Sequence, residues 1–240
     1  LSSRFNLQRL SRFLRLKTPT PKLSFMKRLV QTRDGFTLIE LLVVITIIGI
    51  LATLAPSAIN GVLTNANQAK ALNGARNVAM ALKLYASDHD GNFPPGDKAI
   101  DAFNTLVPAE AGSTGYIKDK KSFIVKGSAW NPQDKNKADD TSLKLAEGQN
   151  HWAYFSGLTS ESSENWPLIF DGPNSADGSY STKKSEKGGV WEGKNAIVVR
   201  VNGSAAKETL TDKKLKVDGQ DNALKAGDTW LTGAKYADPY

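Results

Sequence analysis

Cysteine is absent from all 240 residues, and histidine occurs only twice. A chain without thiols has no disulfide, no cysteine nucleophile and no zinc–cysteine site. Two histidines also argue against a multi-histidine metal centre. At this length a hydrophobic core can form without crosslinks, so we expect one or two domains.

Excess positive charge is confined to the N-terminus. The whole chain carries a formal net charge of +7, from 31 Lys and Arg against 24 Asp and Glu. Residues 1–35 hold nine of these basic residues and a single acid, Asp34. The remainder is therefore nearly neutral, whereas a folded nucleic-acid-binding domain needs a basic face on its ordered part. We expect no nucleic acid partner.

One long apolar run follows the basic residues. From Phe36 to Ile59, 24 residues, the only charged residue is Glu40. A helix of that length reaches about 36 Å, enough for a hydrocarbon core of roughly 30 Å, which favours a membrane span over a buried core helix. The positive-inside rule then places residues 1–35 in the cytoplasm and the rest of the chain outside. A secretory signal peptide is the alternative, but its apolar part is only about 7 to 15 residues long.

Glu40 is an unusual residue for an apolar segment, where an ionised carboxylate is unfavourable. One interpretation is an acid that snorkels to the interface. The other is a carboxylate that pairs with a positive charge from another copy of the chain. A free amine on Phe36, created by cleavage after Gly35, would supply that charge.

The sequence Gly35-Phe36-Thr37-Leu38-Ile39-Glu40, followed by the apolar run, resembles the prepilin-type cleavage and methylation motif of type IV pilins and type II secretion pseudopilins. The resemblance implies that a prepilin peptidase cuts between Gly35 and Phe36 and methylates the new N-terminus. Glu40 would neutralise the N-terminus of a neighbouring subunit during assembly. Gly49 and Pro56 lie in the same assembly helix and are expected to bend it.

The resemblance also implies an organisation of the whole chain. Residues 1–35 would be a cytoplasmic leader that is removed, with Met26 as an alternative start, and residues 36–59 a transmembrane and assembly helix. Residues 60–88 continue that helix with apolar positions at steps of three and four. Residues 89–240 would form an extracytoplasmic globular domain. The protein would sit in a bacterial inner membrane with its C-terminal domain in the periplasm, and would assemble into a fibre in the periplasm or at the cell surface.

A small sheet is expected after the helix. Turn-forming residues at 87–92 end the helix, and a short helix is expected at Ala99–Leu106. The whole stretch from residue 81 to 108 resembles the pseudopilin pattern. Strands are predicted by short apolar runs, at 123–125, 152–155, 168–170 and 195–201. Asn202-Gly203 predicts a type I′ turn that pairs the last run with 204–210. The expected fold is α+β and pilin-like: a long N-terminal helix, membrane-spanning in its first half and amphipathic in its second, packed on a small antiparallel sheet with long loops.

Catalytic and cofactor motifs are weak. Gly188 to Lys194 has the spacing of a phosphate-binding loop, but Asn195 replaces the required Ser or Thr and a strand follows. Neither His89 nor His151 has a partner pattern for catalysis, so we expect no enzyme. We expect no cofactor, although Asp218, Asp221 and Asp228 are calcium candidates, with solvated loop acids as the commoner explanation.

Five tryptophans, at 130, 152, 166, 191 and 230, are interpreted mainly as core and loop anchors, with a carbohydrate-binding surface as the alternative. The resulting hypothesis is a structural subunit of a type II secretion pseudopilus or a type IV pilus-like fibre. Its partners would be copies of itself and other pilins or pseudopilins, the prepilin peptidase, an inner-membrane assembly platform and the lipid bilayer. The alternatives are a membrane-anchored binding module for sugars or an envelope partner, or a pilus subunit for adhesion, motility or DNA uptake.

Overall fold

The computed structural model describes residues 35–108, 113–118, 120–132, 143–174, 178–216 and 235–239, without the side chains of 54–59. The leader and Met26 therefore lie outside the described residues. The chain divides into two compact units, one up to Leu51 and one from Ala52 onward.

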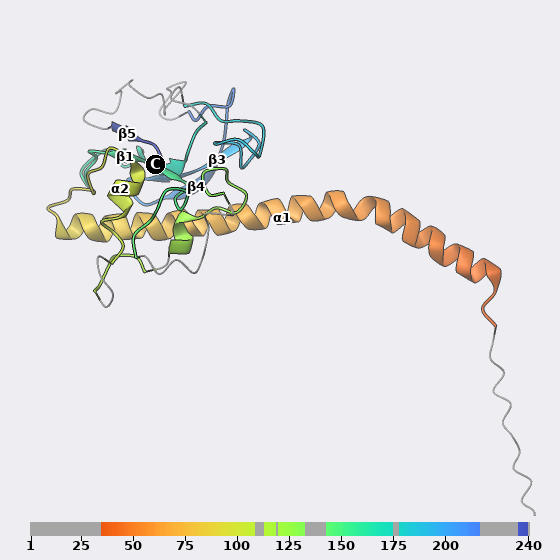
Figure 1. The fold of residues 1–240 in the computed structure, drawn as a ribbon. Helices are drawn as coiled ribbons and strands as arrows, with labels where there is room; N and C mark the ends of the chain where they lie inside the picture. The colour runs from red at the N-terminus through yellow and green to blue at the C-terminus, as the bar shows by residue number, and fades with distance from the viewer. Residues whose placement is uncertain are drawn as a thin grey trace, which may run out of the picture. The chain divides into compact units, whose positions relative to one another are not determined.

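The first element is the helix α1, which spans Leu38–Asp88 (Figure 1). Its helical backbone passes through Pro56 without interruption, and the expected bends at Gly49 and Pro56 stay a prediction. The helix ends at Asp88 because the backbone turns into the left-handed region, with φ of +51° at Asp90 and +80° at Gly91. The Gly91 N–H donates back to the Ala86 carbonyl at 2.8 Å and so caps the last turn. The expected helix end is confirmed.

Five strands form one antiparallel sheet in the order β4-β3-β2-β1-β5 (Figure 1). The strands are β1 Trp152–Ser156, β2 Pro167–Asp171, β3 Asn195–Arg200, β4 Ala205–Thr209 and β5 Lys235–Ala237. Strands β1, β2 and most of β3 are buried along their length, which explains why they appear in the sequence as continuous apolar runs. The expected α+β class with an antiparallel sheet is confirmed.

The β3–β4 hairpin forms at the expected place with a different turn. Gly203 N–H donates to the Arg200 carbonyl at 2.8 Å, and Arg200 N–H donates to the Ser204 carbonyl at 2.9 Å. These bonds enclose a three-residue loop, in which only Gly203 has a positive φ, +87°. A type I′ turn needs positive φ at both central residues. The type I′ prediction is therefore wrong. The loop consists of Val201, Asn202 and Gly203, and it forms a type I turn followed by a glycine in the left-handed region.

The predicted strand at 123–125 is also wrong. A 3₁₀ helix, η1, occupies Lys120–Phe123 instead. The Phe123 carbonyl accepts from the His151 N–H at 2.9 Å, and the Val125 N–H donates to the Asn131 side chain at 3.1 Å. Phe123 and Val125 are buried, so their hydrophobicity reflects core packing, while their backbone bonds go to a loop rather than to a neighbouring strand.

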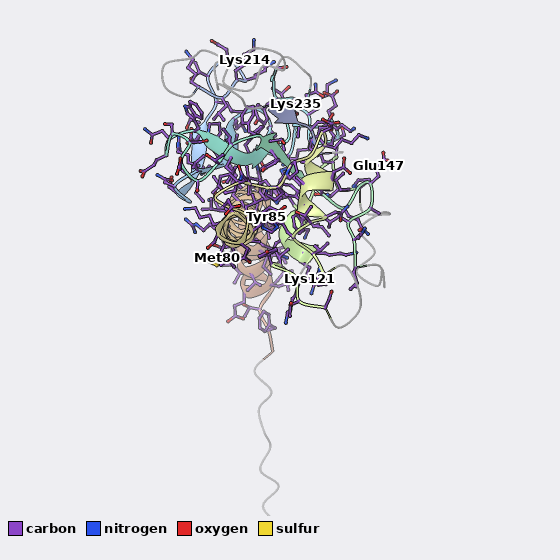
Figure 2. The ribbon with its side chains drawn as sticks, turned by 90° about the vertical axis from the view of Figure 1, so that its left-hand side faces the viewer. Met80, Tyr85, Lys121, Glu147, Lys214 and Lys235 are labelled. Atoms are coloured by element: carbon purple, nitrogen blue, oxygen red, sulfur yellow. The ribbon has the colours of Figure 1, made fainter. Side chains whose placement is uncertain are left out.

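The core of the second unit lies between α1 and the sheet. Figure 2 looks along α1 and shows the sheet on one side of it. The face of α1 in the core is lined by small and medium side chains at helical spacing: Ala71, Ala75, Val78, Ala79, Leu82 and Ala86. These residues belong to one buried cluster with α2 (Ala99–Phe103) and strands β1, β2, β3 and β5. The predicted amphipathic second half of the helix is confirmed, and α2 is shorter than expected.

Two helical glycines differ in the room around them. A Cβ on Gly74 would meet the Ser122 carbonyl oxygen at 2.9 Å, whereas one on Gly61 meets nothing within 4 Å. We expect Gly61→Ala to stabilise the unit by about 0.5–1 kcal/mol, because alanine restricts the unfolded chain more than glycine does. Gly74→Ala should instead destabilise it by about 1–3 kcal/mol through overpacking. Urea denaturation of the two variants measures the difference. Equal denaturation midpoints for Gly61→Ala and Gly74→Ala would show that close packing of η1 against Gly74 does not limit the side chain at that position.

Candidate processing and assembly site

The start of α1 is fixed by a reciprocal pair of hydrogen bonds. Thr37 precedes the helix, and its hydroxyl accepts from the Glu40 backbone N–H at 3.3 Å. The Glu40 carboxylate accepts from the Thr37 backbone N–H at 2.8 Å and from the Thr37 hydroxyl at 2.7 Å. This is a capping box, which satisfies two backbone donors that a helix start leaves without partners. Gly35 and Phe36 lie just outside it in non-helical backbone.

Capping therefore gives Glu40 a role that sequence reasoning had not included. The carboxylate is turned back toward Thr37, the residue that follows Phe36. It lies within one residue of the position where cleavage after Gly35 would create an amine. The T-x-x-E spacing from Thr37 to Glu40 is a capping-box pattern that can be recognised in the sequence.

Large apolar side chains cover the helix after the cap, and they are exposed. Their exposed fractions run from 44% at Val44 to 81% at Leu38. Exposed apolar surface of this extent marks an interaction site. Among the residues with described side chains, no helix combines the length and the hydropathy needed to span a membrane. The segment predicted to do so, 36–59, includes 54–59, whose side chains lie outside the described ones.

The remaining predicted site residues are placed as follows. A Cβ on Gly35 or Gly49 would meet nothing within 4 Å, so packing among the described residues requires neither glycine. The Pro56 side chain lies outside the described residues. Asp218, Asp221, Asp228 and Trp230 also lie outside them, and the described residues contain no group of three His, Cys, Asp or Glu side chains that could hold a metal ion.

A serine, a histidine and an aspartate meet inside the second unit, which gives His151 hydrogen-bond partners that no sequence pattern indicated. His151 Nε2 lies 2.5 Å from Asp171 Oδ1, and His151 Nδ1 lies 2.6 Å from Ser128 Oγ. The other carboxylate oxygen of Asp171 accepts from the Trp191 indole N–H at 2.8 Å and from the Ile197 N–H at 2.6 Å. We call Ser128, His151, Asp171 and Trp191 the buried polar cluster.

Catalysis is not what the buried polar cluster provides. Exposed fractions are 4% for Ser128, 0% for His151 and 1% for Asp171, so no substrate reaches the serine. The hydrogen bonds of the cluster instead connect parts of the chain that are far apart in sequence. His151 precedes β1, Asp171 ends β2 and Ile197 lies in β3, while Ser128 and Trp191 come from two loops. Satisfied buried networks of this kind specify one arrangement of a core.

Burial also affects a neighbouring tyrosine. The Tyr180 hydroxyl donates to the Asp171 carbonyl at 2.8 Å. Desolvation raises the pKa of Tyr180 well above its ordinary value, with a further contribution from the Asp171 charge. Tyr180 therefore stays a neutral hydrogen-bond donor at neutral pH.

Three tryptophans are buried as core and loop anchors: Trp130, Trp152 and Trp191, each at most 6% exposed. Trp166 packs partly buried against the core. Because Trp130, Trp152 and Trp191 are buried, they cannot form part of a carbohydrate-binding surface. The phosphate-loop alternative also fails, because β3 begins at Asn195 directly after Lys194, where a helix would be needed.

A helix capped at Thr37, preceded by a glycine–phenylalanine pair and packed on an antiparallel sheet, defines a pilin-like protein. Comparison with known families agrees: the family described as "Prokaryotic N-terminal methylation motif" matches residues 31–56. The chain is 35% identical over 107 residues to "Fimbrial protein EcpC" of Eikenella corrodens, which covers 40% of this chain and 69% of that protein. The chain belongs to the type IV pilin-like family, which includes pilins and pseudopilins.

Type II secretion proteins are relatives too. The chain is 37% identical over 91 residues to "Type II secretion system core protein G" of Aeromonas hydrophila, covering 36% of this chain and 63% of that protein. The Escherichia coli K12 protein of the same description is 33% identical over 96 residues, covering 38% and 66%. The chain thus spans about two thirds of the length of these relatives. None of the solved structures gives a significant match.

Proposed function

We propose that the protein is a structural subunit of a type II secretion pseudopilus or a type IV pilus-like fibre. The observation that carries the proposal is the exposed apolar helix that starts at the Thr37–Glu40 capping box, immediately after Gly35-Phe36. Relatives with fimbrial and secretion descriptions support it. The activity is assembly of copies, together with other pilins or pseudopilins, and not the turnover of a substrate.

Processing is the first step of the proposed mechanism. A prepilin peptidase cuts between Gly35 and Phe36 and methylates the amine of Phe36. The basic residues 1–35 stay on the cytoplasmic face, while the domain after the apolar helix faces the periplasm. Until assembly, the inner membrane covers the apolar side chains from Phe36 onward.

Polymerisation is the second step, and it depends on an inner-membrane assembly platform. The apolar helices of several copies pack together, which removes their side chains from water after they leave the lipid. A cationic Phe36 N-terminus would be unfavourable in that apolar environment unless an anion compensates it. Glu40 supplies the anion to a neighbouring copy, and one pairing position per subunit fixes the register.

Mass spectrometry of the N-terminus tests the proposal. We expect a mature chain that begins at methylated Phe36. Gly35→Val should leave the leader attached, because the peptidase site then carries a branched side chain. It should not disturb the fold, since a Cβ at this position meets nothing within 4 Å.

Gly49→Ala is the matched control, because its Cβ is equally free of contacts within the chain but lies away from the proposed cut. This variant should be processed normally. An intact leader on the unaltered protein in its native cell would exclude the proposal and favour a membrane-anchored binding module.

A further inference from the structure

Two hollows flank α1 at residues 60–71, the stretch that directly follows the apolar segment in sequence. The larger, about 720 Å³, lies between this part of α1 and the segment that leads into β3. The smaller, about 240 Å³, lies between α1 and the residues after η1. Asn67 lines both, so together they form a surface on both flanks of one helical stretch.

Lysine dominates the charge of this surface. Three lysines line the larger hollow and three line the smaller one, all of them exposed: Lys184, Lys194, Lys207, Lys70, Lys121 and Lys126. Among the residues that the structure describes, Glu192 is the one acid that lines either hollow. We call the six lysines the lysine collar. The concentration of positive charge is notable because the chain after residue 35 is nearly neutral as a whole.

Glu192 does not neutralise the two lysines beside it. Glu192 accepts from Lys194 at 2.8 Å and contacts Lys184 at 3.1 Å, and hydrogen bonds from Lys194 and then Lys184 lower the pKa of Glu192. One negative charge thus faces two positive ones. Lys207 donates to the neutral amide oxygen of Gln68 at 3.3 Å, a contact that leaves its charge uncompensated.

Two apolar side chains are exposed in the same stretch of α1. Val62 is 68% exposed, and Leu63, which lines the larger hollow, is 54% exposed. Flexible lysines around exposed aliphatic residues are typical of surfaces that lie at a lipid interface, since the aliphatic groups enter the headgroup boundary and the ammonium groups meet phosphates.

We propose that the lysine collar binds an anionic phospholipid surface and holds the domain against it. The proposal rests on the proposed function, in which the apolar helix is stored in a membrane. Acidic side chains of a second copy would also meet the lysines, and the experiment below separates that occupant from lipid. We propose lipid because residues 60–71 directly follow, in sequence, the segment that the proposed function stores in a membrane. A lipid surface covers both the lysines and the exposed apolar side chains.

A single fluorescent label tests the proposal, which is practical because the chain has no cysteine. The full-length chain carrying Asn65→Cys places a dye on the larger hollow, where Asn65 is exposed. It is reconstituted into vesicles of phosphatidylcholine, with or without phosphatidylglycerol, that contain a headgroup-labelled energy acceptor. The control carries the dye at Ser87→Cys, an exposed position near the C-terminal end of α1 and away from the lysine collar.

Energy transfer at residue 65 should rise with the phosphatidylglycerol fraction and fall again at high salt. Transfer at residue 87 should not follow the lipid charge. The triple variant K184Q/K194Q/K207Q should lose the rise, since each lysine contributes roughly five-fold to association with an anionic surface. K98Q/K213Q/K214Q removes the same charge elsewhere and should keep it. Figure 2 shows Lys214 on the side of the sheet away from α1, and Lys121 of the collar on the helix side.

Three results would overturn the proposal that the lysine collar binds lipid, each for a different reason. If the protein co-floats with both vesicle types but energy transfer does not change with the phosphatidylglycerol fraction, lipid binding by the lysine collar is excluded. Membrane storage of the apolar helix is then still supported. Transfer between copies that depends on protein density and not on lipid charge would assign the lysines to a second copy. Failure to co-float with either vesicle type would contradict the membrane storage in the proposed function as well.

Discussion

Asp171→Ala is expected to destabilise the second unit by about 3–5 kcal/mol, a large part of the roughly 5–15 kcal/mol that stabilises a domain. The reason is that one buried carboxylate accepts from three groups, the His151 ring, the Trp191 indole and the Ile197 N–H. Alanine would leave all three buried without their acceptor. Urea denaturation followed by tryptophan fluorescence and circular dichroism measures the loss.

Asp97→Ala is the matched control for this experiment. Asp97 also forms an ion pair, with Lys235 at 2.7 Å, but its side chain is 87% exposed. Its removal should leave the denaturation midpoint where it is, because solvent screens exposed pairs. If Asp171→Ala unfolded at the same urea concentration as the parent chain, the buried polar cluster would not be a determinant of this fold.

Glu40→Ala is expected to abolish fibre assembly while leaving cleavage after Gly35 intact. Without the carboxylate, the charged Phe36 amine of a neighbouring copy would enter the apolar helix bundle uncompensated. Electron microscopy and shearing of cell-surface or periplasmic fibres measure assembly, and mass spectrometry of the same samples measures processing. Glu147→Ala removes an exposed acid of the second unit and should assemble normally.

Capping complicates the interpretation of this variant, because Glu40 also closes the start of α1. Thr37→Val separates the two roles. It removes the hydroxyl that accepts from the Glu40 N–H, a change that typically weakens a helix start by about 1 kcal/mol, but it keeps the carboxylate. Fibres from Thr37→Val and none from Glu40→Ala would assign the effect to charge; normal fibres from Glu40→Ala would contradict the pairing.

Features that depend on neighbouring residues could be predicted from the sequence. The extent of α1, its end before Gly91 and the apolar strands β1, β2 and β3 all have local patterns of spacing, turn formers or continuous hydrophobicity. The processing motif is also local, since Gly35, Phe36 and Glu40 lie within six residues.

Features that depend on distant residues could not be predicted. Strand β5 has three residues and is defined by pairing with β1, for example Phe155 with Tyr236. The sequence predicts a strand at Phe123 because a short apolar run of core residues has the same pattern in either backbone conformation. The buried polar cluster joins positions as far apart as Ser128 and Trp191, and no spacing rule connects them.

If the chain polymerises as proposed, the two edges of its sheet have a further consequence. Across the described residues its outer strands are β4 and β5, and an outer strand with free backbone groups can recruit another chain into a continuous sheet. Strand β5 is three residues long, and β4 places charged Lys207 and Glu208 in its middle. Short length and charge both discourage such lateral recruitment. Under the proposed function, assembly through the helix then proceeds without competition from amyloid-like strand pairing, which many copies at high local concentration would otherwise favour.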